Sequence, residues 1–331
     1  MNKKVLVIAS AGGHLTQAMC ATSQCDEIVL VSNKVNIKKD NISKIYKIMD
    51  TQKNIFIHIF NIFFALYVLL KERPAAVFST GGPIALPFAL ICKVSSLKFI
   101  YLDTLSRVVE LSNTGKLIKK YHLYDEFYSQ WKNVASKSNA KYIGKCFDIL
   151  SENNYKPVTE AVEGKPVILV TVGTSQYDFD RLFEMLYKQP LYDNTDVRWV
   201  IQTGHNKLKH TPANGKVVDM ITRSEMEQLV KSASLVISHC GIGSINQMLA
   251  YQKKVLFVPR VSRYNEFSDD HQLQIANEIS SKIFTVLMPE QVMPTITLGE
   301  LLDRKIVTSP VDTTNYKMAN ELKNVLFELK T

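Results

Sequence analysis

Short apolar runs alternate with longer helical stretches along both halves of the chain. In the first half the strand-like runs are KVLVIAS, EIVLVSN, AAVFST and KFIYLDT, followed by DEFYSQW and KYIG. In the second half they are PVILVTVG, VRWVIQTG, KVVDMI, LVISHC, KVLFVPR and IFTVLM. Continuous β-branched runs of this kind are typical of parallel strands covered on both faces. The pattern therefore predicts an α/β protein with two doubly wound, Rossmann-like domains facing a cleft.

The stretch between the two halves, CFDILSENNYKPVTEAVEGKP, is polar and rich in turn residues. We expect an N-terminal domain over residues 1–148, a linker over 149–165 and a C-terminal domain over 166–331. The length of 331 residues suits two domains of about 150 residues each. The last amphipathic run, residues 313–330, is long enough to pack back on the N-terminal domain.

Charge is distributed unevenly between the halves. Residues 1–150 hold 20 Lys/Arg against 10 Asp/Glu, whereas residues 151–331 hold 20 against 21. The basic N-terminal half has three readings: a solvated face, a phosphate-rich ligand, or an anionic membrane surface. Nucleic acid is disfavoured because no reader motif or basic–aromatic cluster is present. The five scattered cysteines form no ligand pattern and indicate reduced thiols in a cytosolic protein.

The segment Asn54–Leu70, NIFIHIFNIFFALYVLL, is the most apolar part of the chain. It is short for a spanning helix, which needs about 20 apolar residues, and it contains His58 and Asn61. We expect a helix packed on a sheet. The alternative is a helix in the membrane interface, with Lys71 and Arg73 at the headgroups.

Three glycine-rich turns follow predicted strands: SAGGHL at 10–15, TVGTSQYDFD at 171–180 and SHCGIGS at 238–244. Glycine allows close approach of a ligand to the backbone, and a helix N-terminus offers free N–H groups, so each turn is a candidate anion site. None completes G-x-G-x-x-G, and NTGK at 113–116 lacks the upstream glycine of a P-loop, which disfavours a dinucleotide or ATP site.

The motif Asp178–Phe179–Asp180 has two readings. A D-x-D pair can hold a divalent metal on a donor diphosphate. Acidic residues also stabilise the start of a helix, and we expect that capping role here. If glycine turns and helix dipoles neutralise the diphosphate, no metal cofactor is required.

The motifs VTVGTSQYDFDRL, DMITRSEMEQLVKSASLVISHCGIGSI and KKVLFVPRVSRYNEFSDDHQLQIA resemble the donor domain of GT-B glycosyltransferases of the MurG type, family 28. The first half, with SAGGHLTQ, FSTGGPIALP and YLDTLSRVVELSNTGKLIKKYHLYDEFYSQW, resembles the membrane-recruiting partner subunit of two-chain transferases that extend lipid-linked sugars. The chain resembles a fusion of the two, partner subunit first, over nearly its full length.

The resemblance implies an inverting GT-B transferase. It would move a sugar from a UDP-sugar to a polyprenyl-diphosphate-linked saccharide in exopolysaccharide or capsule biosynthesis, at the inner face of the membrane. On the donor side it implies backbone N–H contacts from the turns, uracil recognition by the backbone of Met220 and Ile221, and a phosphate contact or strand cap at His239. Gln247 stands where MurG-type enzymes have a glutamate for the ribose hydroxyls. The complete donor set is Gly173, Thr174, Ser175, Gln176, Met220, Ile221, His239, Gly241, Gly243, Ser244, Gln247, Arg260, Asp270, His271 and Gln272.

Within that set, Asp270, His271 and Gln272 match the stretch that contacts the donor sugar and ribose, while Asp269 or Asp270 could also cap a helix. Arg260 or Arg263 could receive a carboxylated donor sugar.

The first half carries the acceptor-side candidates. His14 follows a Gly-Gly pair and is the candidate base, because an imidazole can take the proton of the acceptor hydroxyl. A phosphate contact and a structural role are its alternatives. Arg107 suits a diphosphate, or pairs with Glu110. Lys116, Lys119 and Lys120 are expected to attract anions. The complete acceptor set is Gly12, Gly13, Gly81, Gly82, Arg107 and Lys116.

Two other functions stay open at this point. A UDP-sugar epimerase or hydrolase shares the two-domain form but needs acid/base carboxylates, of which the turns offer few. A non-catalytic UDP-sugar-binding or membrane-recruiting subunit would have a broken donor site, whereas the glycine turns here are intact.

Overall fold

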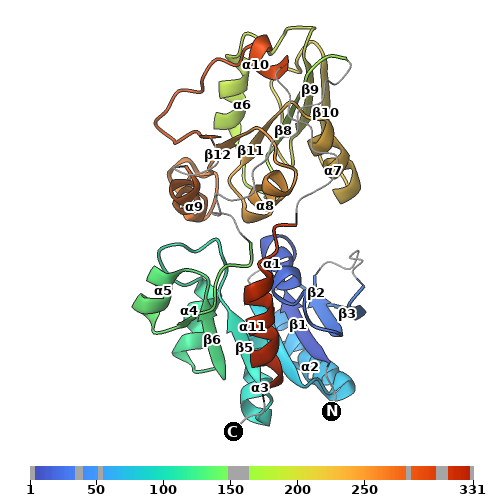
Figure 1. Cartoon of the computed structure of the whole chain (residues 1–331), viewed down its shortest axis with the longest axis vertical. Coiled ribbons are helices and arrows are strands. Elements are labelled where there is room, and N and C mark those ends of the chain that lie inside the picture. Colours follow the sequence, from blue (N-terminus) through green and yellow to red (C-terminus); the bar gives the residue numbers. More distant parts are fainter. Residues whose placement is uncertain are drawn as a thin grey trace. The chain divides into compact units, whose positions relative to one another are not determined.

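The computed structural model describes residues 4–33, 40–50, 55–147, 164–280, 285–302 and 312–328. The chain divides into two compact units (Figure 1). Unit 1 comprises Met1–Asp148 and Thr314–Thr331, and unit 2 comprises Ile149–Thr313. The linker expected over 149–165 lies almost entirely outside the described residues.

Unit 1 is built on a seven-stranded parallel sheet with the strand order β3-β2-β1-β4-β5-β6-β7. Its central strands are short apolar runs with no exposed residue, as expected for a sheet covered on both faces. Its elements are β1 Val5–Ala9, α1 Gly13–Ala21, β2 Ile28–Ser32, β3 Ile42–Lys47, α2 Ile55–Glu72, β4 Ala76–Gly81, α3 Ala85–Ser95, β5 Phe99–Leu102, α4 Asn113–Lys120, β6 Glu126–Ser129, α5 Lys132–Ser138, β7 Lys141–Tyr142 and α11 Tyr316–Phe327.

Helix α11 follows unit 2 in the sequence but packs on α1 of unit 1 (Figure 1) and on β4. Its inner face buries Met318, Ala319, Leu322 and Leu326. The Lys98 ammonium donates to the carbonyl oxygens of Val325 and Glu328, the last of which is the C-cap, at 2.5 and 2.9 Å. Since a cation at a helix C-terminus satisfies free carbonyls, Lys98 helps to fix the end of this helix.

Unit 2 has a six-stranded parallel sheet with the strand order β10-β9-β8-β11-β12-β13. A core around the fully buried Trp199 fills the space between the sheet and its helices. Its elements are β8 Val167–Thr171, α6 Asp180–Tyr187, β9 Arg198–Gln202, β10 Gly215–Val218, α7 Arg223–Ser232, β11 Leu235–His239, α8 Ile242–Ala250, β12 Val255–Val258, a 3₁₀ turn Ser262–Tyr264, α9 His271–Ile279, β13 Thr285–Val286 and α10 Leu298–Leu302.

Both sheets reverse their chain order at one point. In unit 1 the reversal falls between β1 and β4, and in unit 2 between β8 and β11. Ligands of doubly wound sheets bind beyond the carboxyl ends of the strands at such switch points. The turns that leave β1, β4, β8 and β11 are therefore the places to examine. Those after β1, β8 and β11 are the three glycine-rich turns of the sequence, and Gly81 and Gly82 stand at the end of β4.

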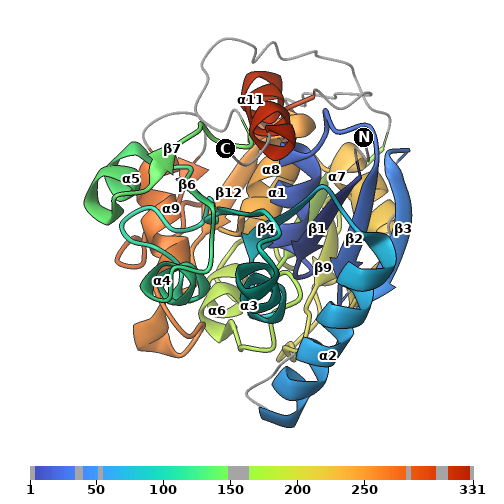
Figure 2. The same cartoon turned by 90° about the horizontal axis from the view of Figure 1, so that it is seen from below.

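Helix α2 runs along the outside of unit 1 (Figure 2). Its buried residues Asn61, Ala65, Val68, Leu69 and Glu72 recur at helical spacing, and Asn61 donates to the Met49 carbonyl. Its opposite face exposes large apolar side chains, namely Phe56, Ile59, Phe60, Ile62, Phe63, Leu66, Tyr67 and Leu70, which we call the apolar face of α2. No helix among the described residues is long and apolar enough to cross a membrane.

Candidate functional site

The turn after β1 lies against the turn after β4 in unit 1. Gly12, with φ +85°, is the N-cap of α1, and Gly81 and Gly82 have φ of +110° and +87°. A Cβ on Gly82 would lie 2.0 Å from Ser10 Oγ, and one on Gly81 would lie 3.0 Å from His14 Cε1. Only glycine fits these two positions, because a side chain on either would separate the turns.

His14, in the first turn of α1, is held by Thr80 at the end of β4. Its Nδ1 lies 2.8 Å from the Thr80 carbonyl oxygen, and the Thr80 hydroxyl donates to the His14 carbonyl at 2.7 Å. A carbonyl accepts only, so Nδ1 carries the proton and Nε2 of the neutral ring keeps its lone pair. The half-buried imidazole is thus oriented as a proton acceptor at the switch point of unit 1.

A buried polar network supports the loop 103–112, and sequence reasoning missed it. Asp103, 1% exposed, accepts from Ser112 N at 2.9 Å and Ser112 Oγ at 2.5 Å. Gln17 and Gln130 join α1 to the start of the same loop: Gln17 Oε1 accepts from Leu105 N and from Gln130 Nε2, both at 2.7 Å. Burial raises the pKa of Asp103. The sequence does place Asp103 directly after a predicted strand, where site residues are expected. The pattern of residues does not show whether its carboxylate is buried or exposed.

The cationic candidates of this loop differ from expectation in one respect. An ion pair of Arg107 with Glu110 was the alternative to a diphosphate contact, and the structure pairs Glu110 with Lys116 at 2.8 Å. Both side chains of that pair are about half exposed, so the Lys116 contact is a surface ion pair. Half-buried Arg107 is close enough to Asp103 to oppose the rise in its pKa.

In unit 2 the ring of His239 lies between two glycine turns. A Cβ on Gly173, whose φ is +75°, would lie 2.6 Å from His239 Cε1, and one on Gly241 would lie 2.6 Å from Nε2. Burial, and secondarily the Arg260 charge, lowers the pKa of His239 to about 4. The ring is therefore neutral near pH 7 and packs between the turns after β8 and β11.

The turn after β11 leads directly into α8. Gly241 is its N-cap without a side-chain hydrogen bond, which leaves the N–H groups of Gly243 and Ser244 in the first turn as free helix donors. A Cβ on Gly243 would meet nothing within 4 Å, so space lies in front of this turn. Such an N-terminus, with its partial positive charge, is suited to a phosphate.

The donor-side candidates outside the DDHQ stretch lie in three further places. Met220 is 47% exposed, and Ile221 stands beside it before α7, whose capping box Thr222–Glu225 fixes the start of that helix. Gln247 is half-buried on α8, and Thr174, Ser175 and Gln176 lie in the turn after β8.

The DDHQ stretch is organised by its own hydrogen bonds. Asp270 is the N-cap of α9, but its carboxylate accepts from Ser262 N rather than from the helix. It is Asp269 that accepts from the His271 backbone N–H, and the His271 ring lies 2.5 Å from the same carboxylate oxygen. Gln272, almost fully buried, accepts from Arg260 N at 3.2 Å.

Two expectations need correction. Arg260 is fully buried, and its guanidinium donates to backbone carbonyls inside unit 2, so it is not placed to receive a sugar carboxylate. The D-x-D motif does not cap α6: its N-cap is Phe179 with no side-chain cap, and only Asp180 lies in the first turn. Among the described residues no group of three or more His, Cys, Asp or Glu side chains is placed to hold a metal ion.

Comparison with solved structures identifies the fold. A crystal structure of MurG from Acinetobacter baumannii superposes with a TM-score of 0.57 at 14% identity, covering 98% of this chain and 99% of that one. A putative UDP-N-acetylglucosamine 2-epimerase from Listeria monocytogenes gives 0.55 at 12% identity, with 97% and 95% covered. At such identities the likeness concerns the fold, and the fold is GT-B.

Sequence relatives narrow the class to glycosyltransferases. The UDP-N-acetylglucosamine--N-acetylmuramyl-(pentapeptide) pyrophosphoryl-undecaprenol N-acetylglucosamine transferase of Prochlorococcus marinus (strain AS9601) is 25% identical over 358 residues, with 98% of this chain and 93% of the relative covered. The transferase of the same description from Streptococcus pneumoniae serotype 19F (strain G54) is 25% identical over 270 residues, covering 79% and 73%.

Residues 167–323 match the Glycosyltransferase family 28 C-terminal domain, and residues 20–146 match the family described as Oligosaccharide biosynthesis protein Alg14 like. The protein is a MurG-like GT-B glycosyltransferase in which an Alg14-like N-terminal domain precedes a family 28 C-terminal domain.

Proposed function

We propose that the enzyme transfers a sugar from a UDP-sugar to a saccharide on a polyprenyl diphosphate, with inversion at the transferred carbon. The proposal rests on the turns at the two topological switch points, between β1 and β4 in unit 1 and between β8 and β11 in unit 2. Unit 2 offers glycine turns and a free helix N-terminus suited to a nucleoside diphosphate, and unit 1 offers an oriented imidazole. The printed names of the relatives supply the chemical class of both substrates.

On the donor side, the diphosphate of the UDP-sugar lies against the turns at Gly173 and Gly241. The first-turn N–H groups of α8 bind phosphate oxygens and stabilise the negative charge that gathers on UDP as it leaves. Met220 and Ile221 read the uracil through their backbone, and Gln247 faces the ribose hydroxyls. No metal is required, because helix dipole and backbone donors neutralise the leaving group.

On the acceptor side, His14 is the general base. Its Nε2 takes the proton of the acceptor hydroxyl while the hydroxyl oxygen bonds to the anomeric carbon. The bond from that carbon to the UDP oxygen breaks on the opposite face, so the configuration inverts. Arg107 and the glycines after β1 and β4 bind the acceptor diphosphate.

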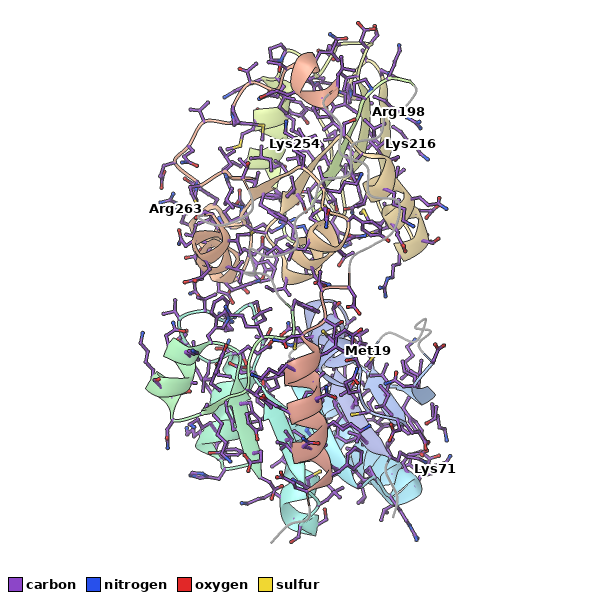
Figure 3. All side chains as sticks on the ribbon, in the orientation of Figure 1. Met19, Lys71, Arg198, Lys216, Lys254 and Arg263 are labelled. Atoms are coloured by element: carbon purple, nitrogen blue, oxygen red, sulfur yellow. The ribbon has the colours of Figure 1, made fainter. Side chains whose placement is uncertain are left out.

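The acceptor lipid places the reaction at a membrane surface, and unit 1 has the features for peripheral binding there. The apolar face of α2 is exposed, and Lys71 lies at its C-terminal end (Figure 3). Apolar side chains beside cations are typical of helices that lie in the interface of anionic membranes. We place the enzyme at the cytoplasmic face, in exopolysaccharide or capsule assembly, in keeping with the resemblance of its two halves to paired transferases.

The first experiment is calorimetric titration of the purified protein with UDP, GDP and dTDP, each with and without EDTA. Selective binding of UDP that EDTA does not change is the expected result. Transfer is then measured with radiolabelled UDP-N-acetylglucosamine first, since that donor is named in the relatives, and other UDP-sugars next, on lipid-linked acceptors. Absence of binding by all three nucleotides would overturn the donor site. Conversion of the UDP-sugar without an acceptor would point to an epimerase.

A further inference from the structure

The loop 172–178, which follows β8, has several carbonyl oxygens turned into the body of unit 2. Arg260 Nη2 donates to the Val172 carbonyl at 3.1 Å, and Nη1 donates to the carbonyls of Tyr177 and Asp178 at 2.9 and 3.0 Å. Gln202 Nε2 donates to the Gly173 carbonyl at 3.0 Å. Two buried side chains therefore hold both ends of this loop from inside.

The direction of these carbonyls fixes the direction of the loop's N–H groups. In a trans peptide unit the C=O and N–H bonds point to opposite sides. Because the carbonyls of Gly173 and Tyr177 point inward, the N–H groups of Thr174 and Asp178 point outward, away from Gln202 and Arg260. The N–H groups that follow the Val172 and Asp178 carbonyls, those of Gly173 and Phe179, are instead bonded to Thr171 Oγ1 and Asn206 Oδ1. The inward hydrogen bonds thus leave Thr174 and Asp178 as the two outward-facing donors for an anion.

Arg260 also brings a buried positive charge beneath the loop. Its side chain is fully buried, and its guanidinium lies 4.4 Å from the centre of the Phe179 ring. The carboxylate of nearby Glu266 accepts hydrogen bonds from Arg181 at 2.8 and 2.9 Å. The hydrogen bonds described for the Arg260 guanidinium all go to backbone carbonyls.

A buried cation is costly. Burial lowers the pKa of Arg260 to about 10, although the charges of Glu266 and Asp178 partly offset that cost. The charge of Arg260 reaches the glycine turns, because it contributes to lowering the pKa of His239 between them.

Gln202 connects the loop to a second part of the site. It is 2% exposed, it accepts from the Thr171 hydroxyl at 2.8 Å, and its Nε2 donates to the Asp219 carbonyl at 2.9 Å as well as to Gly173. Asp219 immediately precedes Met220. Gln202 therefore bridges the diphosphate loop and the segment proposed to read uracil.

We propose that Arg260 and Gln202 are positioning residues for the donor diphosphate. They hold carbonyls of loop 172–178 inward so that the N–H groups of Thr174 and Asp178 face the phosphate oxygens, and Arg260 adds its buried positive charge behind them. The inference rests on the proposed function only in taking UDP as the ligand of this turn.

The test compares Arg260→Gln with Arg263→Gln, a matched control three residues away. Arg263 lies on the outer surface of unit 2, is 51% exposed and pairs with Glu290 (Figure 3). Affinities for UDP and for uridine, which lacks the phosphates, are measured by calorimetry and NMR titration. We expect Arg260→Gln to weaken UDP by roughly 10- to 100-fold, the size of a lost charged hydrogen-bonding group, and uridine by less than about threefold. Arg263→Gln leaves both affinities within about threefold of the parent.

Two further variants keep the test decisive. Arg260→Lys retains the charge but not the planar fork, so we expect an intermediate loss of UDP affinity even if Arg260→Gln does not fold. Gln202→Leu removes the hydrogen bonds to both the loop and the segment before Met220, so we expect the affinities for UDP and for uridine both to fall. The melting temperature of this variant shows whether it is folded.

The outcomes separate the two proposals. If the parent protein does not bind UDP, the proposed function fails. If the parent binds UDP and folded Arg260 variants bind it equally well, or lose UDP and uridine affinity to the same extent, the positioning role of Arg260 is overturned while the donor site stands.

Discussion

The substitution Gly173→Ala tests whether the glycine turn is required by His239. Gly173 has a φ of +75°, and an added Cβ would lie 2.6 Å from Cε1 and 2.8 Å from Nε2 of the His239 ring. The His239 ring has no room to move away from Gly173, because Gly241 lies on its other side. A Cβ built on Gly241 would lie only 2.6 Å from Nε2 of the ring. The new methyl group therefore strains the backbone and overlaps a confined ring.

The two costs have different sizes and origins. A non-glycine residue in a sparsely populated backbone region costs about 1–3 kcal/mol. Inserting a methyl into a filled space costs a further ~1–3 kcal/mol. We expect Gly173→Ala to lower the free energy of unfolding of unit 2 by about 2–6 kcal/mol. This is a large part of the ~5–15 kcal/mol that holds a domain folded. UDP affinity falls with it, since the loop is displaced.

The assay is urea unfolding followed by tryptophan fluorescence. Trp199 is fully buried in unit 2, and Trp131 lies in unit 1, so a Trp131→Phe background leaves a signal from unit 2. In a double-mutant cycle with His239→Ala, the overlap disappears and only the backbone strain remains, which gives a coupling energy of about 1–3 kcal/mol.

Gly243→Ala is the matched control for this cycle. Its Cβ meets nothing within 4 Å and lies in the first turn of α8, so we expect no loss of stability, or a gain of up to about 1 kcal/mol. A Gly173→Ala protein within about 0.5 kcal/mol of the parent would refute the confined-ring argument. Strict additivity with His239→Ala would do the same.

Three more predictions follow from the site and the surface. His14→Ala lowers turnover by more than about 100-fold while UDP affinity is unchanged, and an unaltered turnover removes His14 from the chemistry. The pKa of His239 falls from 6.5 to about 4 on folding, so between these pH values the unfolded chain binds the proton more readily than the folded chain. Urea unfolding should therefore show the free energy of unfolding decreasing by up to about 3 kcal/mol as the pH drops from 6.5 to about 4. The variant His239→Gln should flatten that part of the pH profile. The double variant Phe60→Glu/Phe63→Glu reduces cosedimentation of the protein with anionic vesicles at least ~10-fold. The control Val292→Glu, at a 90% exposed position in unit 2, does not. Equal vesicle binding by the parent, the double variant and the control would exclude the apolar face of α2 as the membrane-binding surface.

The strands with continuous apolar runs could be predicted from the sequence, and so could the parallel sheets they form. Strand β3, ISKIYK, was missed, because it lies at the edge of its sheet and every residue is at least partly exposed. An edge strand need not bury both faces, so it lacks the pattern by which the inner strands were found.

Site positions that require glycine could be predicted from the sequence, whereas the roles of side chains that point into their own domain could not. Gly81, Gly82 and Gly173 were found because positive φ and close approach leave few other residue types. The roles of Arg260 and Gln202 could not be found, since an arginine in a loop has the same pattern whether it faces a ligand or the carbonyls of its own domain. Asp103 was missed for the same reason.

The path of the chain through its two units has a consequence for biosynthesis. Unit 2 is contiguous in sequence, whereas α11 of unit 1 emerges from the ribosome only after unit 2 has been made. At ~5–20 residues per second, the part of α1 and β4 that α11 covers stays open for about 12–50 s, the time needed to make the chain from Gly81 to Phe327. The second domain of the sequence is thus the first that can complete its fold. During that interval, nascent unit 1 presents an apolar surface on which holding chaperones can act.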